Sequence, residues 1–248
     1  MFVDKSLIDT FAPDGKLRAS INLGNPVLAN RPDAQVLPTG ISVDLARKLA
    51  EKLSVELELV VFNTARDSVE AVASERADIG FFAVDPARGA AIAFTEPYLL
   101  IEGFYLVRHD SPFKDNADVD REGVRIAVGK GTAYDLFLSR EIKSATLVRA
   151  ASSQVVVETF LSDELDVAAG VKQVLEQELK RSPNLRLLDK RFMVIQQAMG
   201  LPKSKGEPAA RFLREFVEEM KSTGFIDEAM RNHRVDGATL APSASSNK

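Results

Sequence analysis

The sequence has 248 residues, of which 45% are hydrophobic and 27% charged, with a formal net charge of −4 and no cysteine. This length predicts one large domain or two smaller lobes. The acidic balance argues against a broad nucleic-acid surface, and the lack of cysteine excludes disulfides, thiolate metal sites and a cysteine nucleophile. No stretch reaches the ~18 apolar residues of a membrane span.

Strand-like and helix-like patterns alternate through the first half of the chain. Leu45, Leu49 and Leu53 share one face of a helix predicted over 42–53, with Ser42 as its N-cap. The continuous apolar run at 78–84 is typical of a strand buried on both faces. The remaining patterns predict strands at 17–23, 55–61, 92–94 and 102–107, and a short helix around 69–73.

A second series with the same alternation follows a polar stretch at 108–121, which we interpret as a loop between two lobes. Strands are predicted at 124–128, 145–150, 166–169, 185–188 and 193–200. Helices are predicted from Tyr134 to Leu138, at 152–161, at 171–180 with Val171 facing inward, and around Phe212–Met220 and Phe225–Met230. Alternating strands and helices indicate an α/β fold with two layered, mainly parallel sheets.

The two chain ends carry weak signals. The first residues, MFVDKSLIDTFAPDG, lack a basic start followed by an apolar core, so we expect no signal peptide in this chain. A leader has then been removed, or it never existed. The small polar residues at 241–248 predict a disordered tail.

Six motifs occur in an order that resembles the type II periplasmic solute-binding proteins, in particular the polar amino-acid family that serves ABC importers. The resemblance covers about residues 15–235. It is carried by LRASINLGNPV (17–27), GISVDLARKLAEKL (40–53), VASERADIGFFAVDPARGAAIAFTEPYL (72–99), RIAVGKGTAYDLFL (125–138), FLSDELDVAAG (160–170) and the C-terminal helix region (200–233).

The resemblance implies two lobes joined by hinge strands near 103–108 and 195–200, which close on a ligand held in the cleft. Lobe 1 would comprise 1–106 and 200–248, and lobe 2 would comprise 107–199. It also implies a monomeric, non-enzymatic receptor without cofactor or metal, which binds an amino acid or related small carboxylate and delivers it to an inner-membrane ABC permease. A periplasmic location follows from the family, while the missing leader leaves a cytoplasmic location open.

Arg88 is the sharpest candidate for a ligand contact. It lies just past the end of the apolar run at 78–84, where α/β folds place their ligands, and a guanidinium matches a carboxylate with paired donors. In the family, the corresponding arginine clamps the α-carboxylate of the ligand. The alternative is a solvated loop arginine paired with Asp85. The turn is shorter than the family pattern, and Asp85 replaces its usual Thr or Ser.

The GKGT segment, 129–132, enters a helix, where backbone N–H groups can form an anion site. The alternative is a plain strand-to-helix turn, because the segment has neither a dinucleotide fingerprint nor a P-loop. The resemblance places Thr132, Ala133 and Tyr134 in the cleft, with Gly131 beside them.

The sequence departs from its family at two ligand positions. Val171, followed by Lys172, replaces the acid that pairs with the ligand ammonium, so either another acid substitutes or the ligand is not a conventional α-amino acid. Asn22 replaces an Asp, and a turn with Gly24 and Asn25 replaces the family's aromatic-containing turn; Asn22 and Asn25 could hydrogen-bond a neutral polar ligand. The remaining candidates are Ala83 and two possible apolar walls, Phe62 and Phe82, whose alternative role is plain core.

Two other functions deserve comparison. The same fold hosts cyclohexadienyl dehydratases, which need a general acid in a water-poor cleft; Glu96 and Glu102 are the acids near strand ends. A LysR-type sensor would carry an N-terminal helix-turn-helix, for which the ~16 residues before the first strand are too few.

His109 and His233 lie far apart in sequence, without ligand-like spacing, and we expect both at the surface.

Overall fold

The computed structural model describes residues 3–244, which form two compact units. Unit 1 comprises residues 1–100 and 196–248, and unit 2 comprises residues 101–195. The chain passes from one unit to the other inside two long strands, β5 (Leu99–Arg108) and β10 (Met193–Pro202). The boundaries predicted from the sequence, after residues 106 and 199, fall inside the same two strands.

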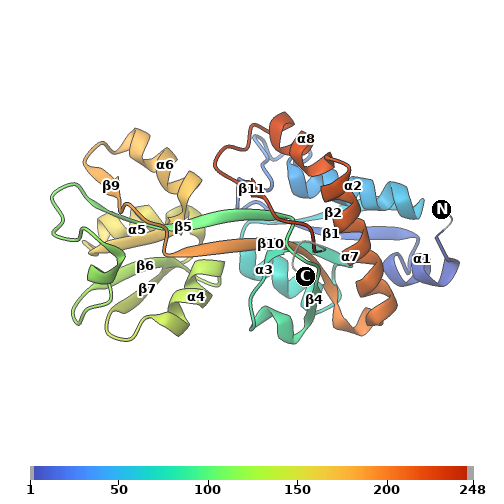
Figure 1. The fold of residues 1–248 in the computed structure, drawn as a ribbon, viewed down its shortest axis with the longest axis horizontal. Coiled ribbons are helices and arrows are strands. Elements are labelled where there is room, and N and C mark those ends of the chain that lie inside the picture. Colours follow the sequence, from blue (N-terminus) through green and yellow to red (C-terminus); the bar gives the residue numbers. More distant parts are fainter. Residues whose placement is uncertain (1–2, 245–248) are drawn as a thin grey trace. The chain divides into compact units, whose positions relative to one another are not determined.

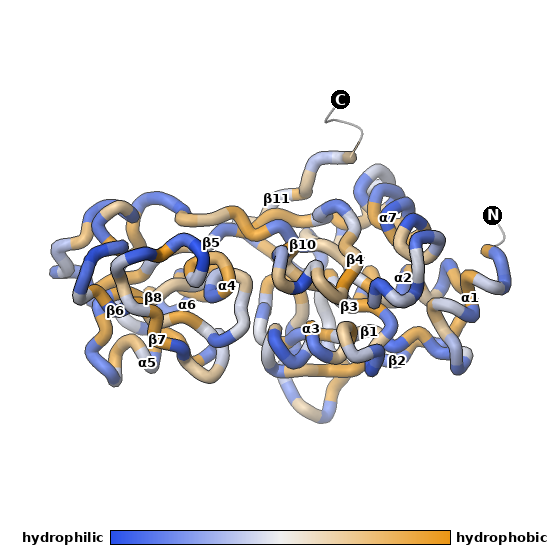
Figure 2. The backbone as a smooth tube through the Cα atoms, turned by 90° about the horizontal axis from the view of Figure 1, so that it is seen from below, coloured by the Kyte–Doolittle hydropathy of each residue, from blue (hydrophilic) through white to orange (hydrophobic). Residues whose placement is uncertain are grey.

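Unit 1 is built on a mixed sheet (Figure 1). Strands β2, β1 and β3 run parallel in that order, and β10 and β4 continue the sheet antiparallel. All five residues of β3 are buried, as the apolar run predicts, and Figure 2 colours β3 and β4 mostly toward the hydrophobic end. The strands are β1 (Lys16–Asn22), β2 (Glu56–Phe62), β3 (Ile79–Ala83), β4 (Ile92–Phe94) and β11 (Thr239–Leu240), which pairs with the start of β5.

The helices of unit 1 follow the predicted apolar stripes, with one addition. They are α2 (Ile41–Leu53), α3 (Ala65–Ala73), α7 (Gly206–Ser222), α8 (Phe225–Asn232) and the unpredicted α1 (Lys5–Phe11). Helix α1 is capped by Asp4, whose carboxylate accepts from the Ser6 N–H, and its buried Phe11 contacts Phe212 of α7 at 5.7 Å between ring centroids. In Figure 2 the tube alternates between hydrophilic and hydrophobic colours along α7, as expected of an amphipathic helix.

The start of α2 differs from the prediction. The N-cap is Gly40, and Ser42 lies buried inside the first turn, where its N–H donates to Leu28 O. Gly40 has a φ of 131°, and a Cβ atom there would lie 2.4 Å from Leu28 O. Glycine is therefore required at this entry, and the close approach of the Leu28 backbone decides where the helix begins.

A buried ion-pair network ties β1, β3 and the segment before α7 together. Asp78, at the start of β3, is fully buried, and its carboxylate accepts from the backbone N–H and the guanidinium of Arg18 at 2.9–3.0 Å. Lys205 Nζ donates to Asp78 Oδ1 at 3.0 Å and to Thr10 O at 2.6 Å. The network therefore connects four segments that are distant in sequence.

The first part of the predicted disordered tail is held on unit 1. Ala241 is 2% exposed and donates its N–H to Tyr98 O, and Ala244 donates its N–H to Glu218. The buried Lys221 pairs with Glu218 and donates to Pro97 O and Pro242 O. These contacts order residues 241–244; the rest of the predicted tail, 245–248, lies outside the described residues.

Unit 2 has the same kind of mixed sheet. Strands β7, β6 and β8 run parallel in that order, and β5 and β9 continue antiparallel. One apolar cluster, around Phe104 and Phe160, packs on one face of the sheet, and another, around Tyr105 and Tyr134, packs on the other. The elements are β6 (Arg125–Gly129), α4 (Ala133–Glu141), β7 (Thr146–Ala150), α5 (Val156–Ser162), β8 (Val167–Val171), α6 (Lys172–Arg181) and β9 (Leu185–Leu187).

One boundary in unit 2 is a correction. The predicted helix at 171–180 begins at Lys172, and Val171 is instead the last residue of β8, with φ −67° and ψ 131°. Its side chain packs on the cluster that contains Tyr134. The apolar pattern ran from the strand into the helix without a break, so the pattern alone placed the boundary one residue early.

Candidate functional site

Arg88 lies at the carboxyl end of β3 and begins a short 3-10 turn, Arg88–Ala90. Its side chain is buried at 8% exposure, and it donates from a guanidinium nitrogen to Ala83 O at 3.1 Å. Burial lowers the pKa of Arg88 to about 10, and the nearby Asp85 carboxylate offsets only part of that effect. The residue is thus a buried cation at neutral pH, unlike the solvated loop arginine of the alternative interpretation.

The turn before Arg88 is rigid for a local reason. Asp85 is 4% exposed; its Oδ1 accepts the Ala87 N–H at 2.8 Å, and its carbonyl accepts the Gly89 N–H at 2.9 Å. An Asp side chain that bonds its own backbone two residues on fixes such turns. Asp85 therefore both shapes the turn and supplies a negative charge near Arg88.

Gln197, on β10, is a buried polar residue that the sequence analysis missed. It is 4% exposed and lies opposite Ala83, the last residue of β3. No hydrogen-bond partner for its Oε1 lies among residues 3–244. A buried carbonyl without a donor is costly, so its position level with the end of β3 marks it as a candidate ligand contact. The polar pair Gln196–Gln197 inside an apolar strand was the available signal.

The loop after β1 carries the predicted Asn22, Gly24 and Asn25, all half-buried. Asn22 Oδ1 accepts the Gly24 N–H at 2.8 Å, and Asn25 Oδ1 accepts the Val27 N–H at 3.3 Å. Both side-chain oxygens therefore bond within their own loop. The amide Nδ2 groups, which are donors, are what these residues offer to a ligand.

The two predicted apolar walls belong to the core of unit 1. Phe82 is 3% exposed and packs with Val72 and Ile92, and its ring fills the space that a side chain at Gly80 would occupy. Phe62 is half-buried against the same cluster. Ala83 is buried and contributes its carbonyl to Arg88.

In unit 2 the GKGT turn uses most of its own amides. The Gly131 N–H donates to Asp135 Oδ2 at 2.8 Å, the Lys130 N–H to Ala150 O and the Thr132 N–H to Gly129 O. The predicted anion site is therefore smaller than the segment suggested. The first two amides of α4, from Ala133 and Tyr134, have no acceptor within a helix and are the ones available to an anion.

Thr132 and Tyr134 hold this turn in place. Thr132 is the N-cap of α4: its hydroxyl accepts the Asp135 N–H at 3.2 Å and donates to Gly129 O at 2.7 Å. The Tyr134 side chain is buried, and burial raises the pKa of its phenol above the usual range. Asp135, which is 4% exposed, pairs with Arg149 at 3.0 Å.

Two cations, Lys172 and Arg191, and the acid that pairs with both of them, Glu102, lie near the end of β8. Lys172 follows Val171 directly, and its Nζ lies 4.0 Å from Glu102 Oε2 and 5.1 Å from the ring centroid of Phe104. Arg191 donates to Glu102 Oε1 at 2.7 Å. Glu102 is thus bound by two cations of unit 2.

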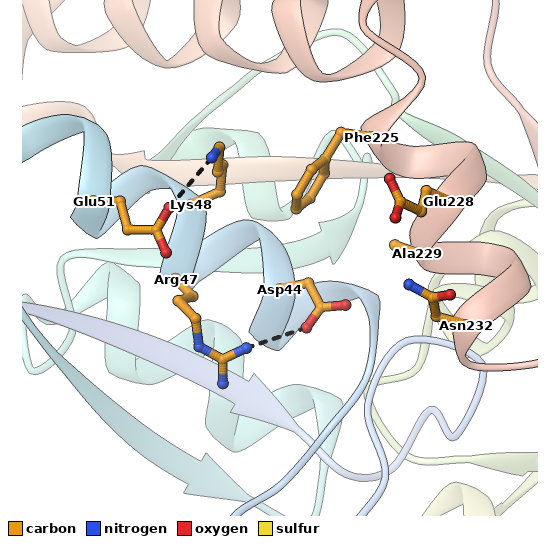
Figure 3. A pocket seen from close by; sticks show the side chains of 8 residues that line it. All are labelled: Asp44, Arg47, Lys48, Glu51, Phe225, Glu228, Ala229 and Asn232. Atoms are coloured by element: carbon orange, nitrogen blue, oxygen red, sulfur yellow. Dashed lines mark hydrogen bonds and ion pairs between the residues drawn. The ribbon is translucent and has the colours of Figure 1, made fainter.

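A separate pocket of about 230 Å³ lies between α2 and α8 of unit 1 and contains none of the predicted ligand residues. Figure 3 shows the ion pairs Arg47–Asp44 and Lys48–Glu51 along α2, facing Phe225 and Glu228 of α8. His233, at the end of α8, is half-buried with Nε2 2.6 Å from Asp44 Oδ2, so it joins the two helices, whereas His109 is exposed as predicted.

The chain matches a known protein family. A family model described as bacterial extracellular solute-binding proteins, family 3, matches residues 22–234. The chain belongs to this family. The fold class and the family predicted from the sequence are thereby confirmed, and no helix within residues 3–244 has both the length and the apolar character of a membrane span.

Relatives of this family 3 solute-binding protein include the amino-acid-binding protein AabA of Dichelobacter nodosus. The two are 26% identical over 140 residues, which cover 56% of this chain and 55% of AabA, so the match spans about half of that relative.

Solved structures share the fold at low sequence identity. The solute receptor for L-cysteine of Neisseria gonorrhoeae has a TM-score of 0.79 at 20% identity and covers 95% of this chain and 99% of its own. A mutant of ArgBP from T. maritima has a TM-score of 0.77 at 21% identity, covering 93% and 100%. An ancestral amino-acid-binding protein, a precursor of cyclohexadienyl dehydratase, has a TM-score of 0.74 at 21% identity, covering 91% and 98%.

In this solute-binding protein the predicted site residues fall into two groups, one in each unit. Those of unit 1 are Asn22, Gly24, Asn25, Phe62, Phe82, Ala83 and Arg88, to which the structure adds Gln197. Those of unit 2 are Gly131, Thr132, Ala133, Tyr134, Val171 and Lys172. Within each unit the polar members gather near the carboxyl ends of parallel strands, the edge where α/β sheets bind ligands.

Proposed function

We propose that the chain is the solute receptor of an ABC importer, that it acts outside the cytoplasmic membrane, and that it binds a small carboxylate through Arg88. The buried guanidinium of Arg88 carries this proposal. Burial lowers its pKa to about 10 despite the nearby Asp85, so the ligand-free fold holds a cation in a place that disfavours charge. A ligand carboxylate supplies a bidentate, oppositely charged partner that offsets the cost of burying this charge.

From the family we infer that the receptor is a monomer and that its partner is an inner-membrane permease, to which it delivers its solute. Closure of two lobes on the ligand stays a prediction from the sequence. The wider substrate range of the relatives, which includes cysteine for the gonococcal receptor, indicates that the same fold accepts different solutes.

The positions of the two candidate acids, Glu96 and Glu102, favour a non-enzymatic role over a dehydratase role. Glu96 is exposed, and Glu102 is already bound by Arg191 and Lys172, so neither is placed as a general acid in a water-poor site. The dehydratase precursor among the structural relatives shares the fold, and a fold by itself assigns no reaction.

The first test is a thermal-shift screen of the purified protein with α-amino acids, hydroxy acids and mono- and dicarboxylates. A ligand present at 100 times its Kd adds ~2.7 kcal/mol to the free energy of unfolding, which gives a clear rise in Tm. We expect at least one carboxylate class to raise the Tm, and the methyl esters of the same compounds to have no effect. A screen in which no carboxylate stabilises the protein would contradict the proposal.

The lowered pKa of Arg88 predicts an alkaline limit to binding. Because the carboxylate binds the protonated guanidinium, affinity should be constant from pH 7 to about 9 and fall by about tenfold per pH unit above pH ~10. In the same pH range Arg88 of the unbound protein loses its proton. Because binding then becomes weaker, the rise in Tm on binding should become smaller. Calorimetry from pH 7 to 11 measures this limit. The Lys172→Gln variant is the control, because an alkaline limit that persists in it is not caused by titration of Lys172. A loss of affinity between pH 7 and 8 would contradict the assignment to Arg88.

A further inference from the structure

We propose that the solute is a hydroxycarboxylate, an anion whose second polar group is a hydroxyl and not an ammonium. This inference rests on the proposed function, since it names the chemical class that the same site accepts. It follows from the charges and hydrogen-bonding groups at the strand ends of each unit, taken separately.

In unit 1 three short segments directly follow the parallel strands: 23–27 after β1, 63–64 after β2 and 84–88 after β3. Asp85 is the acid in these segments and Arg88 the base. The Asp85 carboxylate already accepts the Ala87 N–H and lies near Arg88. An incoming ammonium would therefore meet a buried cation beside an acid that already balances part of its charge.

In unit 2 the corresponding segments are 130–132 after β6, 151–155 after β7 and 172–173 after β8. They contain two bases, Lys130 and Lys172, and no acid. The nearest carboxylates are committed: Asp135 pairs with Arg149 and accepts the Gly131 N–H, and Glu102 pairs with Arg191 and Lys172. Of the two explanations for Val171, substitution by another acid is thus not supported within unit 2.

The donors at these edges point to acceptor groups on the solute. In unit 1, Asn22 and Asn25 each use their side-chain oxygen in a bond within their own loop, and their Nδ2 groups are donors. In unit 2, considered by itself, the amides of Ala133 and Tyr134 and the ammonium of Lys172 are donors as well. Carboxylate oxygens satisfy such groups, whereas an ammonium would add further donors.

Gln197 Oε1 supplies a neutral acceptor of the kind that a hydroxyl needs. It is buried, level with the end of β3, and has no hydrogen-bond partner among the described residues. An ammonium carries three donors and a full charge, which a single amide oxygen compensates poorly when water is excluded. A hydroxyl carries one donor and no charge, so one neutral acceptor satisfies it.

Matched pairs of solutes that differ only in this group test the proposal by calorimetry: L-malate and L-aspartate, L-2-hydroxyglutarate and L-glutamate, L-phenyllactate and L-phenylalanine. In the pair that fits the site best, we expect the hydroxy acid to bind at least about tenfold more tightly than the amino acid. An amino acid that binds as tightly as its hydroxy partner overturns the inference and leaves the proposed function standing. If no carboxylate binds at all, the proposed function fails and the inference fails with it.

One variant with a matched control tests the part that Gln197 plays. Gln197→Leu should weaken a hydroxy acid by roughly threefold to tenfold and leave the corresponding deoxy acid, such as succinate for malate, unchanged. The neighbouring exposed Gln196→Leu should change neither. Equal losses for hydroxy and deoxy acids in Gln197→Leu would overturn the assignment of the hydroxyl.

Discussion

Arg88→Met is expected to abolish carboxylate binding while the protein stays folded. Loss of a buried, charge-assisted contact costs about 2–5 kcal/mol of binding free energy, a decrease in affinity of roughly 30-fold to several-thousand-fold. Methionine keeps the apolar stem, so the packing beside Ala83 is largely retained. The bond from Arg88 to Ala83 O is lost, but burial disfavours the Arg88 cation, and the two effects on stability oppose each other.

Calorimetry with the best solute from the screen measures this effect, and denaturant unfolding checks that the variant is folded. Arg47→Met is the matched control, because the Arg47 side chain is 57% exposed and lines the separate pocket between α2 and α8. Undiminished affinity in Arg88→Met would show that another group holds the carboxylate. Arg88→Lys should recover only part of the affinity, since an ammonium cannot offer the paired planar donors of a guanidinium.

Asp78→Asn is expected to lower the free energy of unfolding strongly. The substitution keeps the shape and one acceptor for the Arg18 N–H, but it leaves Lys205, whose side chain is 10% exposed, as a buried cation without its carboxylate. Breaking a buried ion pair from one side costs about 3–5 kcal/mol. For a chain of this size that corresponds to a decrease in Tm of roughly 6–20 °C.

Denaturant unfolding followed by circular dichroism provides the measurement. Asp9→Asn removes an acid from the exposed pair with Lys5, where the side chains are 59% and 86% exposed, and should change stability by less than about 1 kcal/mol. If Asp78→Asn costs no more than this control, the network that connects Arg18, Asp78 and Lys205 does not stabilise unit 1.

Local patterns were sufficient for most of the elements and for the position of Arg88. The apolar run at 78–84 predicted a strand, and a strand followed by a turn places Arg88 at the carboxyl edge of a sheet. Its burial could not be read from the same residues, because burial depends on the tertiary packing around the turn. The pairing of Gln197 with Ala83, from more than a hundred positions away, was likewise not visible in the local pattern, although the polar pair Gln196–Gln197 marked the position.

The elements that the sequence analysis missed or displaced are those decided by tertiary contacts. Helix α1 is seven residues long, too short for a clear period, and its Phe11 is buried by contact with Phe212. Ser42 is a favourable N-cap residue, yet the approach of the Leu28 carbonyl moves the cap to Gly40. Committed hydrogen bonds, such as Gly131 to Asp135, likewise reduced the predicted anion site to two amides.

The insertion of unit 2 into unit 1 sets an order for folding during synthesis. Residues 101–195 are contiguous and can fold as soon as they leave the ribosome, whereas β3 gains its second neighbour only when β10 has been made. Until then the strand Ile79–Ala83, apolar throughout, has one open edge. Truncations after unit 2 should therefore fail by aggregation before any question of ligand binding arises, and the nascent chain is most exposed to misassembly while residues 101–195 are being translated.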